Sequence, residues 1–294
     1  MKKKVYMILL ALVLVVTGCT SNNNKDNEKI NVVASFFPVY DLIKRVGGDK
    51  VEVNNLTQTG DAHSFEPGIK DMENISKSEL LAINGAGFEG WIDQIKSSQP
   101  DLQVLDLSED LDLIEVDGHT DPHTWLSVKN PQLMLEKIKD KLIELDKKNE
   151  AYYNENYQKA LEEFKTVEKK YDEELSKYKG RAFIAPHAAF NYLLQEYDLE
   201  QVGIEGINSV NEPNAARMKE IVDIMKSKNI DTVFYEYGQS DKIAQTVAKE
   251  VNGKVLPIST LEVITQKDVD DGMDYIKLLE MNLENLVTSF EQDI

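Results

Sequence analysis

Two spacings of hydrophobic residues alternate along this chain, and together they predict its elements. Short, continuous apolar runs are typical of buried strands, whereas apolar residues three or four positions apart are typical of helices with one packed face. These runs, together with an alternating apolar pattern at residues 51–56, predict strands at 30–34, 51–56, 80–83 and 102–107, and again at 182–185, 201–204, 232–235 and 254–258. Segments with the helical spacing lie between and after them, so strands are expected to alternate with helices in two successive groups.

This alternation favours parallel sheets that are covered by helices on both faces. The chain also exceeds the usual size of a single domain, so two domains are expected. We predict an α/β fold of two lobes, each with a four-stranded parallel sheet, joined by a long helix. The N-terminal lobe is expected at residues 30–129, the helical segment at 130–179 and the C-terminal lobe at 180–294.

The expected linking helix is marked by its composition. Residues 130–178 contain no glycine and one proline, Pro131. Asn130 can cap a helix, and proline is tolerated at the first helical position. Apolar residues then recur at the helical spacing as far as Tyr178, and Gly180 suits a helix end. These features predict a helical connection between the two lobes.

Residues 146–149 carry no apolar side chain, which predicts a break in this helix with Asn149 as the cap of its second part. A helix over residues 150–178 would be about 43 Å long, enough to run along two lobes. The alternative is a coiled-coil arm, but the tyrosines of its apolar stripe are bulky for a two-stranded seam.

The N-terminus has the features of a leader. Three lysines at positions 2–4 precede an apolar run, Val5 to Val16, that is too short to span a bilayer, which takes roughly 20 residues. Val16-Thr17-Gly18-Cys19 then resembles a bacterial lipobox. We expect residues 1–18 to be a lipoprotein signal peptide, Cys19 to carry a lipid anchor, and residues 19–29 to form a flexible tether. An ordinary signal peptide with an incidental cysteine is the alternative.

Charge and cysteine content exclude several classes of protein and of site. The net charge of −19 becomes −22 when the three leader lysines are removed. Such an acidic chain has no basic surface for nucleic acid, and it repels anionic lipid, so membrane association should depend on the anchor. Cys19 is the only cysteine, which leaves no disulfide framework and no thiolate metal site.

Candidate metal ligands come from the histidines, which are His63, His119, His123 and His187. Three of them lie at or beyond the carboxyl ends of expected strands, where open parallel sheets bind ligands. His63 and His123 fall in the first lobe and His187 in the second, so facing lobes would bring them together. Glu262 follows the last expected strand and is a fourth candidate. Neutral imidazole suits Zn²⁺, and a carboxylate can complete a tetrahedral shell.

The sequence around these residues resembles a known family. The matching stretches are SFFPVYD at 35–41, HSFEP at 63–67, DPHTWL at 121–126, PHAAFNYL at 186–193 and TVFYE at 232–236. They resemble the metal-binding (cluster A-I) solute-binding lipoproteins of bacterial ABC importers, in particular the zinc-uptake branch. The resemblance covers essentially everything after the tether.

The resemblance implies two α/β lobes joined by a rigid long helix, with a metal ion between them. It also implies that the metal ligands are His63, His123, His187 and Glu262. Glu236 matches a family glutamate that is usually not a ligand. Many zinc-branch members have a long histidine-rich loop before the D-P-H motif, whereas here that loop is only residues 117–120. His119 is therefore expected to face solvent.

The manganese branch typically has a carboxylate where His187 stands. Three imidazoles and one carboxylate form a softer donor set than two of each, which favours Zn²⁺ over Mn²⁺. The expected function is a monomeric, lipid-anchored extracytoplasmic receptor that captures Zn²⁺, delivers it to an ABC permease in the membrane and catalyses no reaction. Alternatives are a manganese receptor, a surface adhesin, a receptor for another solute such as a chelated metal, and a zinc hydrolase. The hydrolase is disfavoured because Glu262 fills the fourth position.

Overall fold

The computed structural model describes residues 29–57, 62–207 and 213–292. The expected signal peptide, Cys19 and nearly all of the tether lie outside these residues. Within the described part of the chain, no helix is long and apolar enough to cross a membrane.

The N-terminal sheet has four parallel strands in the order β2-β1-β3-β4. They are β1 (Ile30–Ala34), β2 (Val51–Asn55), β3 (Leu80–Ile83) and β4 (Val104–Asp106), with helices α1 (Phe37–Gly47), α2 (Ile69–Lys77) and α3 (Ile92–Ser98). Val32 and Ala34 face the main core and Val33 faces the opposite side, so both faces of the sheet are buried.

The C-terminal sheet is also four-stranded and parallel, in the order β10-β9-β7-β8. Its strands are β7 (Ala182–His187), β8 (Glu200–Glu205), β9 (Thr232–Glu236) and β10 (Lys254–Ile258). The helices of this half are α6 (Asn191–Tyr197), α7 (Ala215–Lys228), α8 (Lys242–Lys249), α9 (Gln266–Asp270) and α10 (Tyr275–Gln292). Read from β8, the order is β8-β7-β9-β10, which matches the order of the first sheet. The predicted α/β fold with two four-stranded parallel sheets is confirmed.

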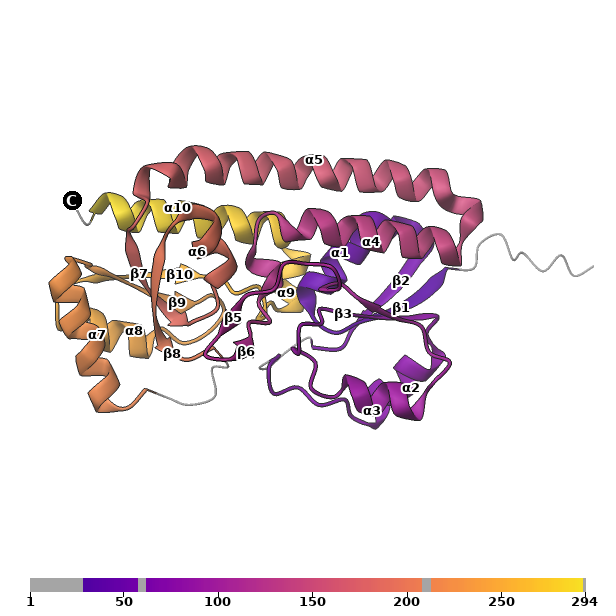
Figure 1. The fold of residues 1–294 in the computed structure, drawn as a ribbon, viewed down its shortest axis with the longest axis horizontal. Coiled ribbons are helices and arrows are strands. Elements are labelled where there is room, and N and C mark those ends of the chain that lie inside the picture. Colours follow the sequence, from indigo (N-terminus) through magenta and orange to yellow (C-terminus); the bar gives the residue numbers. More distant parts are fainter. Residues whose placement is uncertain (1–28, 58–61, 208–212, 293–294) are drawn as a thin grey trace, which may run out of the picture.

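Three helices run along one side of the molecule and connect its halves (Figure 1). They are α4 (Asn130–Leu145), α5 (Glu150–Leu175) and α10, and α5 packs against both of the others. With 26 residues, α5 is about 39 Å long and extends over both sheets. The predicted break is present as a 3₁₀ turn at Lys147–Asn149.

Of the two predicted helix caps, the first is wrong and the second is right in position only. Asn130 lies inside α4, and the hydroxyl of Ser127 accepts the backbone N–H groups of Lys129 and Asn130 instead. Asn149 occupies the N-cap position of α5, but its side chain makes no capping bond, and its amide donates to Asp146 Oδ2 at 2.6 Å. At α4 the hydroxyl of Ser127 takes the role that sequence preference gave to asparagine.

A small antiparallel hairpin, β5 (Glu115–Val116) and β6 (His119–Thr120), was not expected from the apolar pattern. Its turn residues, Asp117 and Gly118, have φ angles of 52° and 80°, as a type I′ turn requires at both central positions. The dipeptide Asp-Gly is itself a hairpin signal. In Figure 1 the hairpin lies between the two halves.

The main hydrophobic core is continuous across the molecule. It includes Phe36 after β1, Trp125 before α4, Phe164 of α5, Phe234 of β9 and Tyr275 at the start of α10. Smaller clusters fill the outer face of each sheet under α2 and α3 and under α7 and α8. The shared core fixes the two halves relative to each other. The exact boundaries of the lobes stay a prediction.

Candidate metal site

The four candidate ligands lie together between the two sheets. His63, His123, His187 and Glu262 each offer one ligand atom, and these atoms all lie within 4.8 Å of one another. His63 follows β2 and His123 follows β6, whereas His187 ends β7 and Glu262 follows β10. Each half therefore supplies two of the four side chains. The expected strand at 182–185 extends further than predicted, so His187 is held by sheet hydrogen bonding rather than by a loop.

Several distances between ligand atoms are close to the edge of a tetrahedral zinc site, and all of these atoms lie within 4.8 Å of one another. The Nε2 atoms of His63 and His123 are 3.3 Å apart, and Glu262 Oε2 is 3.3 Å from His63 Nε2. Glu262 Oε1 is 3.6 Å from the Nε2 atoms of both His123 and His187. A tetrahedron with Zn–N bonds of 2.0–2.1 Å has edges of about 3.3–3.4 Å. A small adjustment of the side chains would place all four around one Zn²⁺.

The group is buried and contains polar atoms that lack partners. His123 is 0% exposed, and His187 and Glu262 are nearly as buried. Among the described residues, neither His187 Nε2 nor Glu262 Oε1 has a hydrogen-bond partner. A buried polar atom without a partner typically costs about 1–3 kcal/mol. A cation between these atoms would satisfy both.

The protonation states are set by competition between burial and pairing. Burial alone would raise the pKa of Glu262, but its contacts with His187 and His63 hold that pKa well below the usual range. Burial would lower the pKa of His187, but Glu262 outweighs it and raises the pKa. Burial lowers the pKa of His123, which keeps that imidazole neutral, as a metal ligand must be.

Asp121 fixes the orientation of His123. The Nδ1 atom of His123 lies 2.7 Å from Asp121 Oδ1, and the Asp121 side chain is fully buried. Burial would raise the pKa of Asp121, but the hydrogen bond with His123 outweighs it, and the pKa is lowered. An ionised carboxylate on Nδ1 leaves Nε2 as the ligating nitrogen. Asp121 belongs to the D-P-H motif, yet sequence reasoning gave it no role.

The loop that carries Glu262 has an unusual backbone. Leu261 is fully buried and has a φ of 64°, a left-handed conformation that typically costs about 1–2 kcal/mol outside glycine. Its N–H donates to Ser259 Oγ at 2.9 Å, and Trp125 Nε1 donates to the carbonyl of Thr260 at 2.7 Å. These bonds hold the reversal that returns Glu262 to the site.

Glu236 lies beside this loop but outside the group of four. Its Oε1 accepts the N–H and hydroxyl of Thr260 at 2.9 and 3.1 Å. Burial raises the pKa of Glu236 to about 7. Glu236 is not among the four grouped side chains, in agreement with the expectation that it is not a ligand.

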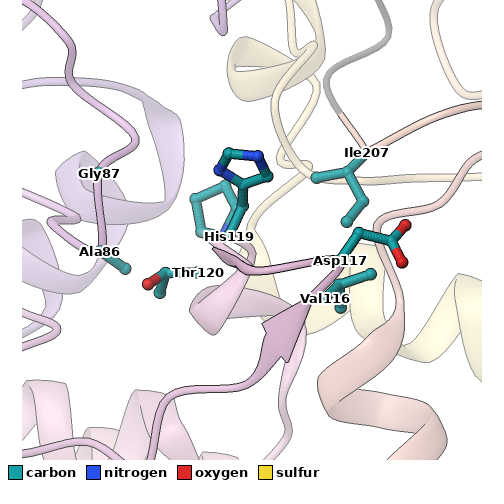
Figure 2. A pocket seen from close by; sticks show the side chains of 8 residues that line it. Ala86, Gly87, Val116, Asp117, His119, Thr120 and Ile207 are labelled. Carbon is teal, nitrogen blue, oxygen red and sulfur yellow. The ribbon is translucent and has the colours of Figure 1, made fainter.

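A groove of about 570 Å³ leads along the hairpin next to Pro122, the neighbour of His123. Figure 2 shows residues of the hairpin, among them His119, together with Ala86 and Gly87 of the N-terminal half and Ile207 of the C-terminal half. His119 is exposed, as expected, and does not join the four candidate ligands.

The chain is similar in sequence and in structure to known zinc-binding proteins. A family model described as ZnuA, zinc-uptake complex component A periplasmic, matches residues 32–289. The zinc-binding lipoprotein AdcA of Streptococcus pneumoniae is 29% identical over 309 residues, which cover 99% of this chain and 62% of AdcA. The Zn(II)-bound ZnuA-like domain of AdcA has a TM-score of 0.81 at 30% identity, covering 90% of this chain and 100% of that domain. The chain thus spans less than two thirds of the length of AdcA.

Two further relatives match along nearly their whole length. The high-affinity zinc uptake system protein ZnuA of Bacillus subtilis is 29% identical over 305 residues, covering 96% of both chains. The laminin binding protein Lmb of Streptococcus agalactiae, described as bifunctional with adhesin and metal transporting activity, has a TM-score of 0.81 at 30% identity, over 89% of this chain and 99% of Lmb. Since the family model matches from residue 32 to residue 289, the chain belongs to the family of zinc-uptake component A, or ZnuA, proteins.

Proposed function

We propose that this protein is the extracytoplasmic receptor of a zinc importer, which binds Zn²⁺ between its two halves and delivers it to an ABC permease. The observation that carries the proposal is the convergence of three imidazole Nε2 atoms and one carboxylate on a buried point, with spacings close to those of a tetrahedral zinc site. The ligands are His63, His123, His187 and Glu262. The family and its zinc-binding relatives support this reading.

The donor set favours Zn²⁺ over Mn²⁺. Imidazole suits zinc, whereas Mn²⁺ prefers carboxylate, carbonyl and water oxygens. Only one of the four proposed donors is a carboxylate. A manganese receptor is therefore the less favoured reading of the same site.

The same set of donors argues against a zinc hydrolase. A catalytic zinc site keeps an open position for water, whereas Glu262 would occupy the fourth position here. We propose that the bound ion is cargo and that no reaction is catalysed. A bound Co²⁺ substitute that retains an exchangeable water would contradict this.

The proposal includes an anchored location outside the cell membrane. Residues 1–18 would be removed, Cys19 would be acylated, and residues 19–29 would tether a monomeric receptor whose lobes span 30–129 and 180–294 around the helical segment 130–179. The lipobox-like sequence before Cys19 supports the anchor. Loss of detergent-phase partitioning in Cys19→Ser would be the check.

Calorimetry on the mature chain from Ser21, stripped of metal, tests the metal assignment. We expect one tight Zn²⁺ site, weak Mn²⁺ binding, and a loss of Zn²⁺ affinity beyond about 100-fold in His123→Ala. The 10–100-fold typical of losing an outer partner is a lower bound for losing a ligand. His119→Ala is the matched control, since it removes an exposed imidazole four residues away, and it should bind Zn²⁺ normally.

Other outcomes would redirect the proposal. Tight Mn²⁺ binding would move the chain to the manganese receptors. A protein with no tight metal site would leave adhesion as the next candidate, because the adhesin Lmb shares this fold along nearly its whole length. Metal-independent binding to laminin would then be the first measurement.

A further inference from the structure

We infer that Asn191, in the first turn of α6, is a positioning residue for the metal ligand His123 and acts on it through Asp121. His123 and Asp121 belong to the N-terminal half, whereas Asn191 belongs to the C-terminal half. The orientation of one half's ligand therefore depends on contact with the other half. The inference rests on the proposed zinc site.

The carboxylate of Asp121 divides its two oxygens between the halves. Oδ1 accepts the backbone N–H of His123 at 3.0 Å and contacts its Nδ1 at 2.7 Å. Oδ2 accepts the side-chain amide of Asn191 at 2.8 Å. Since Asp121 is fully buried, water cannot readily replace either partner, and losing Asn191 would leave a carboxylate oxygen short of a donor.

The amide of Asn191 is itself held in the required orientation. Its Oδ1 accepts from Gln201 Nε2 at 2.9 Å, and Gln201 Oε1 accepts the backbone N–H of Phe190 at 3.2 Å. Gln201 lies on β8, next to β7 in the sheet. The chain of bonds makes Asn191 present its N–H₂ group, not its oxygen, to Asp121.

The same short segment also carries a ligand. His187 ends β7 only four residues before Asn191, so a displacement of this segment moves both residues together. If a permease displaces this segment, His187 leaves the ion while Asp121 loses Asn191 and His123 loses its fixed ring. Two of the four ligands would thus weaken in one movement, which gives a route to metal release.

The neighbouring residue supplies a matched control. Tyr192 donates its hydroxyl to the backbone carbonyl of Asp121 at 2.9 Å, across the same interface, but does not bond its carboxylate. The same hydroxyl accepts the backbone N–H of Ile114 at 3.3 Å, so Tyr192→Phe removes two interface hydrogen bonds and leaves the link from Asn191 to His123 in place. A general effect of weakening the interface would appear in both variants.

The test compares the mature protein with Asn191→Leu, Asn191→Ala and Tyr192→Phe. Zn²⁺ affinity is measured by competition with a chelator, and the tautomer of His123 in the metal-free proteins by ¹⁵N NMR of labelled histidine. We expect the Asn191 variants to lose about 10–100-fold in Zn²⁺ affinity, as for other outer partners of metal-bound histidine, and to lose the single Nδ1–H tautomer of His123. Tyr192→Phe should keep both properties. Asn191→Ala provides the measurement if Asn191→Leu does not fold.

Two results would overturn the inference while leaving the proposed function intact. One is wild-type affinity and tautomer in a folded Asn191 variant. The other is an equal loss in Tyr192→Phe, which would show a general interface effect. Failure of the wild-type protein to bind Zn²⁺ would instead overturn the proposed function itself.

Discussion

His187 is the residue on which the choice of metal depends most directly. It is placed by the last pairing of β7 with β8, and its Nε2 points at Glu262 Oε1 from 3.6 Å. A nitrogen at this position gives the site three imidazoles and one carboxylate. An oxygen there would give two of each, a harder donor set.

We therefore predict that His187→Glu shifts the metal preference toward Mn²⁺. The ratio of Zn²⁺ to Mn²⁺ affinity should fall at least about tenfold, because Mn²⁺ gains an oxygen ligand and Zn²⁺ loses an imidazole. Competition calorimetry on purified protein measures the ratio. His119→Glu makes the same substitution at an exposed histidine and should leave the ratio unchanged. An unaltered ratio in His187→Glu would mean that this residue does not set selectivity.

The sequence revealed the four candidate ligands but not the residues that orient them. Histidines at strand ends and a family motif are visible in a linear chain. The bond from Asn191 to Asp121 joins residues 70 positions apart, and no local pattern indicates it. The left-handed backbone of Leu261 is equally invisible, because leucine gives no signal for positive φ.

At the scale of elements, α5 holds the halves together through specific contacts. The ring of Phe164 packs edge-on against Tyr275 of α10 with centroids 5.3 Å apart, and Arg45 of α1 lies over the same ring. Tyr171 donates its hydroxyl to the carbonyl of Leu279 at 2.7 Å. The helix thus contacts elements from both ends of the chain.

Phe164→Ala should destabilise the whole protein by about 3–5 kcal/mol, the usual effect of emptying a fully buried aromatic position. Urea unfolding followed by circular dichroism measures this loss. Because the core is continuous, we expect one transition rather than two. Lys159→Ala, an exposed change on the same helix, should stay within about 0.5 kcal/mol. A loss below about 1 kcal/mol in Phe164→Ala would show that α5 contributes little to the core.

Elements were predictable where many residues carry the pattern. Most strands of both sheets follow from apolar runs, and β2 follows from an alternating pattern. The break near Asp146 follows from four residues without an apolar side chain. The hairpin and α9 were missed because two to five residues form too short a window for periodicity. The cap at the start of α4 was wrong because another local residue, Ser127, accepts the first backbone N–H groups in place of Asn130.

Across the whole molecule, several buried groups bind protons differently in the folded and unfolded states. Burial raises the pKa of Glu89, in the N-terminal half, and of Glu236, in the C-terminal half, to about 7. Glu262 raises the pKa of His187 above 6.5 despite burial. Above pH 6.5 the folded, metal-free protein therefore binds more protons than the unfolded chain does. The lowered pKa of His123 has the opposite effect on proton binding, because the folded state then binds fewer protons than the unfolded chain. This difference appears mainly below pH 6.5, where the unfolded imidazole becomes protonated.

Stability decreases with pH wherever the folded state binds more protons. We predict that the Tm of the metal-free protein falls between pH 6.5 and 8, by about 2–4 °C for each ~1 kcal/mol lost. The stabilisation by zinc has the opposite dependence on pH. Zinc binds neutral His187, so it competes with a proton whose concentration falls as pH rises. The gap between zinc-loaded and metal-free Tm should therefore widen over this range, as measured by calorimetric scans at fixed Zn²⁺. In His123→Ala, the Tm measured with zinc should stay close to the Tm of the same variant without zinc. A gap that stays constant or narrows would show that zinc does not compete with protons at these histidines.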